Sequence, residues 1–229
     1  MKGGDHVNKN LKKLAIVVML AAALVMALAG CGPKKPTADD AKNYVQAVLD
    51  VMCTGDYDHS VEIADIEEGK ETELRDKAID EIIDELAQES ALNDEVKAGL
   101  KDYMVTAFSK AKYTVTDAVE SEDGGYDVTV SIEPMRAFDA LGEDFQNKLM
   151  EKVMEDPQGY MAMSEEEQLN YLMTLAIEFL NEGLEDPQYD PAVDVVVHYG
   201  LMDEKENIYG CTEAEGKKLG EKLFSTEGL

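Results

Sequence analysis

Apolar residues recur at helical spacing along most of the chain. The first such stripe follows Thr37, a residue type that caps helices, and it ends at Gly55. Comparable stripes predict further helices over residues 71–89, 93–108, 138–153, 164–183 and 212–224, with one or two helical turns within 60–66. Two of these helices start with a Ser/Thr-x-x-Glu capping box, formed by Ser164 with Glu167 and by Thr212 with Glu215.

The apolar pattern changes to a period of two in two regions. Residues 113–119 and 126–132 flank Asp123-Gly124-Gly125, whose glycines suit a tight turn, so they predict a β-hairpin. Residues 193–201 and 208–211 predict a second hairpin. Strands thus come in pairs, which indicates an α+β fold with about six helices packed on a mostly antiparallel sheet made of two hairpins. One sheet face carries Thr, Ser, Asp and Glu side chains, so this face is either solvated or lines a cavity.

The N-terminal segment has the order of charge and hydropathy that export signals have. Lysines precede an uncharged apolar run over residues 14–28, which is shorter than the ~20 residues that a membrane-spanning helix needs. The following residues, Leu28, Ala29, Gly30 and Cys31, resemble the lipobox of bacterial lipoproteins. In that motif the cysteine thiol receives a diacylglyceryl group and becomes the first residue after cleavage. The resemblance implies that Cys31 is lipidated.

This interpretation divides the chain into three parts. Residues 1–30 are expected to be a lipoprotein signal peptide, residues 31–37 the lipidated cysteine with a polar tether, and residues 38–229 a single α+β domain. The domain is then expected on the extracytoplasmic face of the cell membrane, anchored by lipid. The alternative is an ordinary secretory signal, because Ala27-Leu28-Ala29 also fits a small-x-small cleavage pattern.

The charge balance narrows the choice of partners. The chain has 21 Lys and Arg against 49 Asp and Glu, and its formal net charge is −28. Removal of residues 1–30, with four lysines and one aspartate, would bring this charge to −31. Because nucleic-acid binding depends on basic side chains that neutralise phosphates, no nucleic-acid partner is expected. An anionic membrane surface would also repel the domain, which leaves the lipid as its attachment.

The order of these features resembles that of a known group of proteins. Lipobox and tether are followed by Tyr-Val-Gln-Ala-Val-Leu-Asp at residues 44–50 and by Thr-Gly-Asp-Tyr at residues 54–57. This order is similar to that of small acidic lipoproteins of Gram-positive bacteria that carry an uncharacterised domain. Members lack an assigned activity, so the resemblance carries no functional residue to this chain. The element order is also similar to cystatin-like and nuclear-transport-factor-like folds, which often enclose a pocket between sheet and helices.

The reactive residues are few. Cys53 and Cys211 form one disulfide or remain two buried thiols. The histidines His59 and His198 lie near no Gly-x-Ser-x-Gly elbow, and His198 is expected on a strand as a satisfied or solvated side chain. Residues of these types at these spacings predict neither a metal site nor a cofactor. Met161-x-Met163, with Met150, Met154 and Met173 nearby in sequence, offers thioethers that suit Cu(I). Methionines at helical spacing usually fill a core, which is the alternative interpretation of these residues.

These observations favour a binding role over an enzymatic one, because no catalytic motif follows residue 31. The first hypothesis is a lipid-anchored accessory protein that binds a protein, peptide or small ligand at the cell envelope. Two alternatives remain open: a hydrolase that acts on the wall or on glycans through paired carboxylates, and a structural envelope protein.

Overall fold

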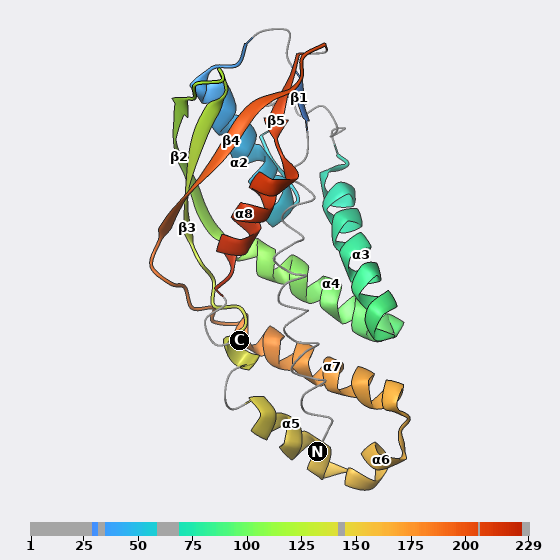
Figure 1. The fold of residues 1–229 in the computed structure, drawn as a ribbon. Coiled ribbons are helices and arrows are strands. Elements are labelled where there is room, and N and C mark those ends of the chain that lie inside the picture. The colour runs from blue at the N-terminus through green and yellow to red at the C-terminus, as the bar shows by residue number, and fades with distance from the viewer. Residues whose placement is uncertain (1–28, 32–34, 59–68, 142–144, 206, 226–229) are drawn as a thin grey trace.

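The structure, a computed structural model, describes residues 29–31, 35–58, 69–141, 145–205 and 207–225. An antiparallel sheet occupies one end of the molecule, and helices pack against it and extend to the other end (Figure 1). This arrangement confirms the α+β prediction. The predicted signal sequence up to residue 28, His59 and the turns expected within 60–66 lie outside the described residues. Within the described part of the chain, no helix combines the length and apolar character that crossing a membrane requires.

The helices agree closely with the sequence pattern. Their bounds are α2 Ala38–Thr54, α3 Glu71–Ser90, α4 Asp94–Ser109, α5 Phe145–Glu155, α6 Pro157–Ala162, α7 Glu165–Gly183 and α8 Glu213–Leu223. Thr37 and Ser164 each form the complete capping box, and Asn93 caps α4 by accepting a hydrogen bond from the Val96 backbone N–H. Gly55 ends α2 in the left-handed conformation, with φ 76°.

The single helix predicted over residues 138–153 is wrong in its first part. Asp139–Leu141 form a 3-10 turn, η1, and the described part of helix α5 starts at Phe145, with residues 142–144 outside the described residues. The apolar spacing continues across both pieces, but Gly142 between them has a low helix propensity. After α5 the chain forms the short helix α6, which the sequence analysis missed. Proline is tolerated in a first helical turn, and the Asp156 side chain caps this helix by accepting a hydrogen bond from the Gly159 N–H.

The sheet contains both predicted hairpins and one additional strand. Its order is β1-β5-β4-β3-β2, and all neighbours are antiparallel. The strands are β1 Ala29–Cys31, β2 Lys112–Glu120, β3 Tyr126–Glu133, β4 Val193–Asp203 and β5 Ile208–Cys211. The additional strand β1 is formed by residues of the predicted lipobox, and it pairs with the outer edge of β5.

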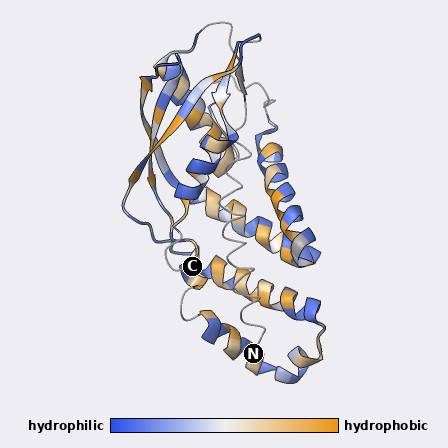
Figure 2. Ribbon diagram, viewed as in Figure 1, coloured by the Kyte–Doolittle hydropathy of each residue, from blue (hydrophilic) through white to orange (hydrophobic). Residues whose placement is uncertain are grey.

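The inner face of the sheet packs against α2. Apolar side chains alternate into the core along the two central strands; they are Val128, Val130 and Ile132 of β3 and Val195 and Val197 of β4. Tyr44 of α2 contacts Tyr199 of β4, with ring centroids 4.9 Å apart. Figure 2 shows the corresponding alternation of hydrophobic and hydrophilic residues along the strands.

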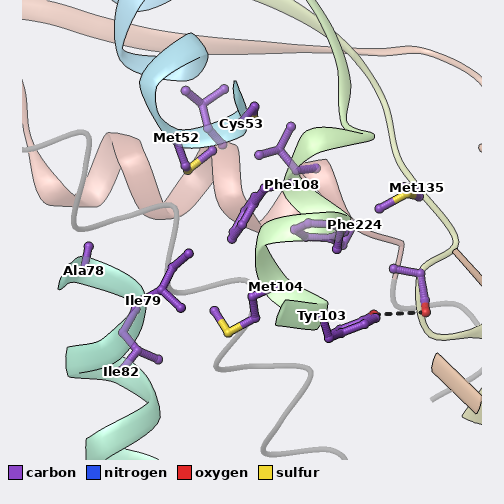
Figure 3. Packing of buried hydrophobic residues seen from close by; sticks show 14 of the residues in the cluster. Met52, Cys53, Ala78, Ile79, Ile82, Tyr103, Met104, Phe108, Met135 and Phe224 are labelled. Atoms are coloured by element: carbon purple, nitrogen blue, oxygen red, sulfur yellow. Dashed lines mark hydrogen bonds between the residues drawn. The ribbon is translucent and has the colours of Figure 1, made fainter. Parts of the chain in front are cut away.

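Helix α4 lies at the centre of the helical part of the core. Phe108 of α4 packs edge-on against Phe224, at a centroid distance of 5.3 Å, and thus fixes the C-terminal segment after α8 (Figure 3). The Tyr103 hydroxyl donates a hydrogen bond of 3.2 Å to the Ala137 carbonyl, which joins α4 to the segment after β3. Helices α3 and α7 pack on α4, and α5 packs on α7.

A buried asparagine connects α7 to the turn between α3 and α4. The Asn170 side chain accepts a hydrogen bond of 2.8 Å from the Asn93 N–H. It also donates to the carbonyl groups of Ala91, at 3.1 Å, and Glu166, at 2.9 Å. Ala91 has a positive φ of 49°, so the chain reverses sharply where this side chain holds it.

Candidate functional site

The proposed lipidation residue lies at the end of the sheet. Cys31 is the last residue of β1 and pairs with Ile208 of β5, and Gly30 pairs with Tyr209. The predicted tether is attached to the domain soon after Cys31. Lys35 Nζ lies 2.6 Å from a carboxylate oxygen of Glu120, and the Tyr126 hydroxyl donates a 3.0 Å hydrogen bond to the Pro36 carbonyl. The chain is therefore held against the sheet from Lys35 onward.

The second feature is the outer face of the sheet, opposite α2. It spans β2, β3 and β4, and its side chains are all exposed or half-buried. We define the outer face by these residues: Asp117 of β2; Asp127, Thr129 and Ser131 of β3; and Asp194, Val196 and His198 of β4. Of the two alternatives for the polar face, the structure thus shows a solvated one.

His198 lies between two carboxylates on this face. Its Nδ1 is 3.0 Å from Oδ1 of Asp127, which is its register partner on β3, and its Nε2 is 3.1 Å from Oδ2 of Asp123 in the β2–β3 turn. The imidazole can donate to both carboxylates at once only when both ring nitrogens are protonated. Asp123 is itself held in place because its carboxylate accepts hydrogen bonds from the Ser121 hydroxyl and the Gly125 N–H. These hydrogen bonds, and to a smaller extent His198, lower the pKa of Asp123.

Two glycines make room for the imidazole. A Cβ atom on Gly125 would lie 2.6 Å from the Tyr199 carbonyl oxygen and 2.9 Å from Cε1 of His198. A Cβ atom on Gly200 would lie 2.5 Å from Nε2 of His198. Because real Cβ contacts are longer than this, the ring position depends on glycine at both residues.

This arrangement agrees with the prediction of a satisfied strand histidine. Both ring nitrogens of His198 already have carboxylate partners, so neither presents a vacant position to a substrate. The sequence alternation had placed His198 and Asp127 on the outer face of the sheet, but only the strand register shows that they are neighbours. Asp123 and the two glycines were missed as partners of His198.

Helix α8 covers part of the edge of β4. Strand β5 pairs with β4 only from Tyr199 onward, so the preceding backbone groups on this edge need other partners. Glu215 accepts a 3.1 Å hydrogen bond from the His198 backbone N–H, and Lys218 Nζ donates a 2.9 Å hydrogen bond to the Val196 carbonyl. The capping box predicted for Thr212 and Glu215 therefore forms only in part. The Thr212 hydroxyl accepts from the Glu215 N–H, while the Glu215 carboxylate binds β4 instead.

The cysteines are not bridged in the structure. Cys53, in the last turn of α2, and Cys211, at the end of β5, are both free and buried. Of the disulfide and the two thiols considered from the sequence, the structure has the thiols. Burial raises the pKa of each thiol to about 12. They are therefore poor nucleophiles at neutral pH.

The methionines near the α5–α6 turn are surface residues. Met150, Met154 and Met161 have exposed fractions of 54%, 62% and 73%, so the interpretation as core filler does not hold for these three. Met173, by contrast, is buried. The residues that the structure describes contain no group of three or more His, Cys, Asp or Glu side chains suited to a metal ion.

Comparison with known proteins gives a fold but no family. No protein-family model matches the chain, and no curated protein matches it significantly. A similar fold is found in the crystal structure of a candidate lipoprotein, ycdA, from Bacillus subtilis, with a TM-score of 0.54 and 14% sequence identity. The match covers 81% of this chain and 56% of ycdA, so the chain spans little more than half the length of that protein. At this identity the likeness concerns the fold alone.

Proposed function

We propose that this chain is an extracytoplasmic lipoprotein whose outer sheet face binds a cationic protein or peptide at the cell envelope. The anchor is a diacylglyceryl group on Cys31. It is supported by the lipobox sequence, and the fold shared with a candidate lipoprotein of Bacillus subtilis agrees with it. The resemblance to small acidic lipoproteins of Gram-positive bacteria points the same way.

The observation that carries the binding role is the solvated outer face. It presents carboxylates from three adjacent strands, namely Asp117, Asp127 and Asp194, on a hydrogen-bonded and therefore rigid sheet. Asp127 lies 3.0 Å from Nδ1 of His198, which leaves Asp117 and Asp194 as the main acidic contacts for a partner. Charge complementarity raises association rates and selects a basic partner, such as a surface or peptide rich in Lys and Arg.

Crosslinking in the producing cells tests this binding role. A photo-crosslinking residue replaces Thr129, which lies between Asp117 and Val196 in the strand register, and a control crosslinker replaces Lys77 on α3. We expect a discrete crosslinked protein from position 129 and none from position 77. Equal products at both positions would contradict a role for the outer face.

Charge reversal on the outer face tests whether the partner is positively charged. The double variant Asp117→Lys/Asp194→Lys should lose the crosslink from position 129. Glu85→Lys/Asp102→Lys on α3 and α4 changes the net charge equally at exposed positions and should keep it. Loss in both variants would indicate a non-specific effect of net charge and count against the outer face.

The anchor is tested separately by mass spectrometry of the membrane-extracted protein. A diacylglyceryl group is expected on Cys31 as the first residue, and Cys31→Ala should remain unprocessed and unlipidated. A processed protein without lipid would instead indicate the ordinary secretory signal.

A further inference from the structure

Three separate parts of the chain meet at the sheet end of the molecule. They are β1 with Cys31, the tip of the β4–β5 hairpin, and the β2–β3 turn with the attached Lys35. Figure 1 shows this end at the top, together with the start of α2, while α5 and α6 lie at the opposite end. We infer that the sheet end rests on the outer surface of the bilayer, with Leu201 and Met202 in contact with the lipid headgroup layer. This inference depends on the proposed lipid on Cys31.

The strand register places the anchor close to the hairpin tip. Cys31 pairs with Ile208, and Ile208 pairs with Asp203. Since neighbouring strands lie ~4.8 Å apart, the backbone of Cys31 lies about 10 Å from that of Asp203. The acyl chains on Cys31 would have to lie in the hydrocarbon layer, so this residue would lie in the headgroup region, which is roughly 5–8 Å thick on each side. The hairpin tip would then be within reach of the same layer.

This geometry does not depend on β1 alone. Signal-peptide cleavage would leave Cys31 as the only residue of β1, but Pro36 remains bound to Tyr126 and Lys35 remains paired with Glu120. The five steps from Cys31 to Pro36 span at most about 17 Å even when fully extended. The anchor therefore cannot place the domain far above the bilayer or turn the sheet end away from it.

The hairpin tip has the side chains that such a contact requires. Leu201 and Met202 are exposed by 45% and 48% and lie near the end of β4. Asp203 and Glu204 follow them in the turn and are exposed. These carboxylates oppose deeper insertion, so the contact is shallow and confined to the headgroups.

Fluorescence quenching in vesicles tests the orientation. The full-length gene is expressed, and the lipidated product is purified and reconstituted into phosphatidylcholine vesicles that contain nitroxide-labelled lipid. An environment-sensitive fluorophore is attached through Met202→Cys or, as the matched control at the opposite end, through Met161→Cys. Both methionines are exposed, and the native thiols Cys53 and Cys211 are buried, so labelling is selective for the new thiol.

We expect several-fold stronger quenching at position 202 than at position 161. Equal quenching at both positions, or stronger quenching at position 161, would overturn the orientation. Mass spectrometry of the same vesicles distinguishes a wrong orientation from a missing lipid anchor. Lipid on Cys31 without quenching at position 202 refutes only the orientation, whereas absence of lipid on Cys31 refutes the anchor and the orientation with it.

Discussion

Asn170 offers the clearest test of how the helical part is held together. Replacement by Ala removes three hydrogen bonds from a side chain that is 5% exposed. At about 1 kcal/mol for each hydrogen bond, the loss is about 3 kcal/mol. Alanine has a better helix propensity than asparagine and returns about 0.6 kcal/mol, so we expect a net loss of about 2–2.5 kcal/mol in the free energy of unfolding.

Urea denaturation followed by circular dichroism measures this loss. With a slope of about 2 kcal/mol per M, the midpoint should fall by about 1 M. Asn147→Ala on α5 is the matched control, because this asparagine is exposed and also lies within a helix. It should leave the midpoint unchanged or raise it slightly. A fall of less than about 0.3 kcal/mol for Asn170→Ala would refute the reasoning, because it is smaller than the cost of one lost hydrogen bond.

Three further predictions concern single sites. Gly125→Ala should lower the free energy of unfolding by about 1–3 kcal/mol, measured by urea denaturation, because its Cβ would lie 2.6 Å from a backbone carbonyl oxygen. In the control Gly183→Ala, the nearest neighbour of the new Cβ lies 3.6 Å away, so the free energy of unfolding should not change. The two buried cysteines, with pKa values of about 12, should react with a thiol reagent only after unfolding, and rapid native labelling of either would contradict their burial. Thr37→Ala should cost about 1 kcal/mol through the lost cap. Hydrogen bonds from the Thr37 backbone N–H and, second, from its hydroxyl lower the pKa of Asp40, and the variant loses only the hydroxyl. The hydroxyl's share of this stabilisation is present above the ordinary pKa of 3.8 and is lost as the pH falls below it. The difference in unfolding free energy between the two proteins should therefore narrow from neutral to acidic pH in urea titrations, and a constant difference would argue against a role for the ionised Asp40 carboxylate.

The elements that the sequence predicted well depend on local interactions. The N-cap predicted at Thr37 and the capping box predicted at Ser164 involve residues three positions apart, and both form. The hairpin turn at Asp123-Gly124-Gly125 likewise follows from glycine in a tight turn, where Gly124 has φ 85°. Local sequence was sufficient in these cases because no distant part of the chain competes for the same groups.

The predictions failed where a distant segment competes. Glu215 has the spacing of a capping residue, but the edge of β4 beyond the end of β5 leaves the His198 N–H without a strand partner, and the carboxylate binds there instead. The cluster around His198 is similar. Alternation indicates the face on which a side chain lies, but only the register identifies Asp127 as the neighbour among 49 acidic residues.

Strand β1 connects the predicted export signal with the fold. Cleavage before Cys31 would remove Ala29 and Gly30, two of the three residues that cover the outer edge of β5. The processed sheet would then end at β5, which contains only the four residues Ile208–Cys211. Short edge strands give few consecutive hydrogen-bonding groups to a foreign strand and therefore resist edge-to-edge association. A mature lipoprotein could thus lose β1 without gaining a long adhesive edge, which is consistent with an interaction surface on the outer face of the sheet rather than on its edge.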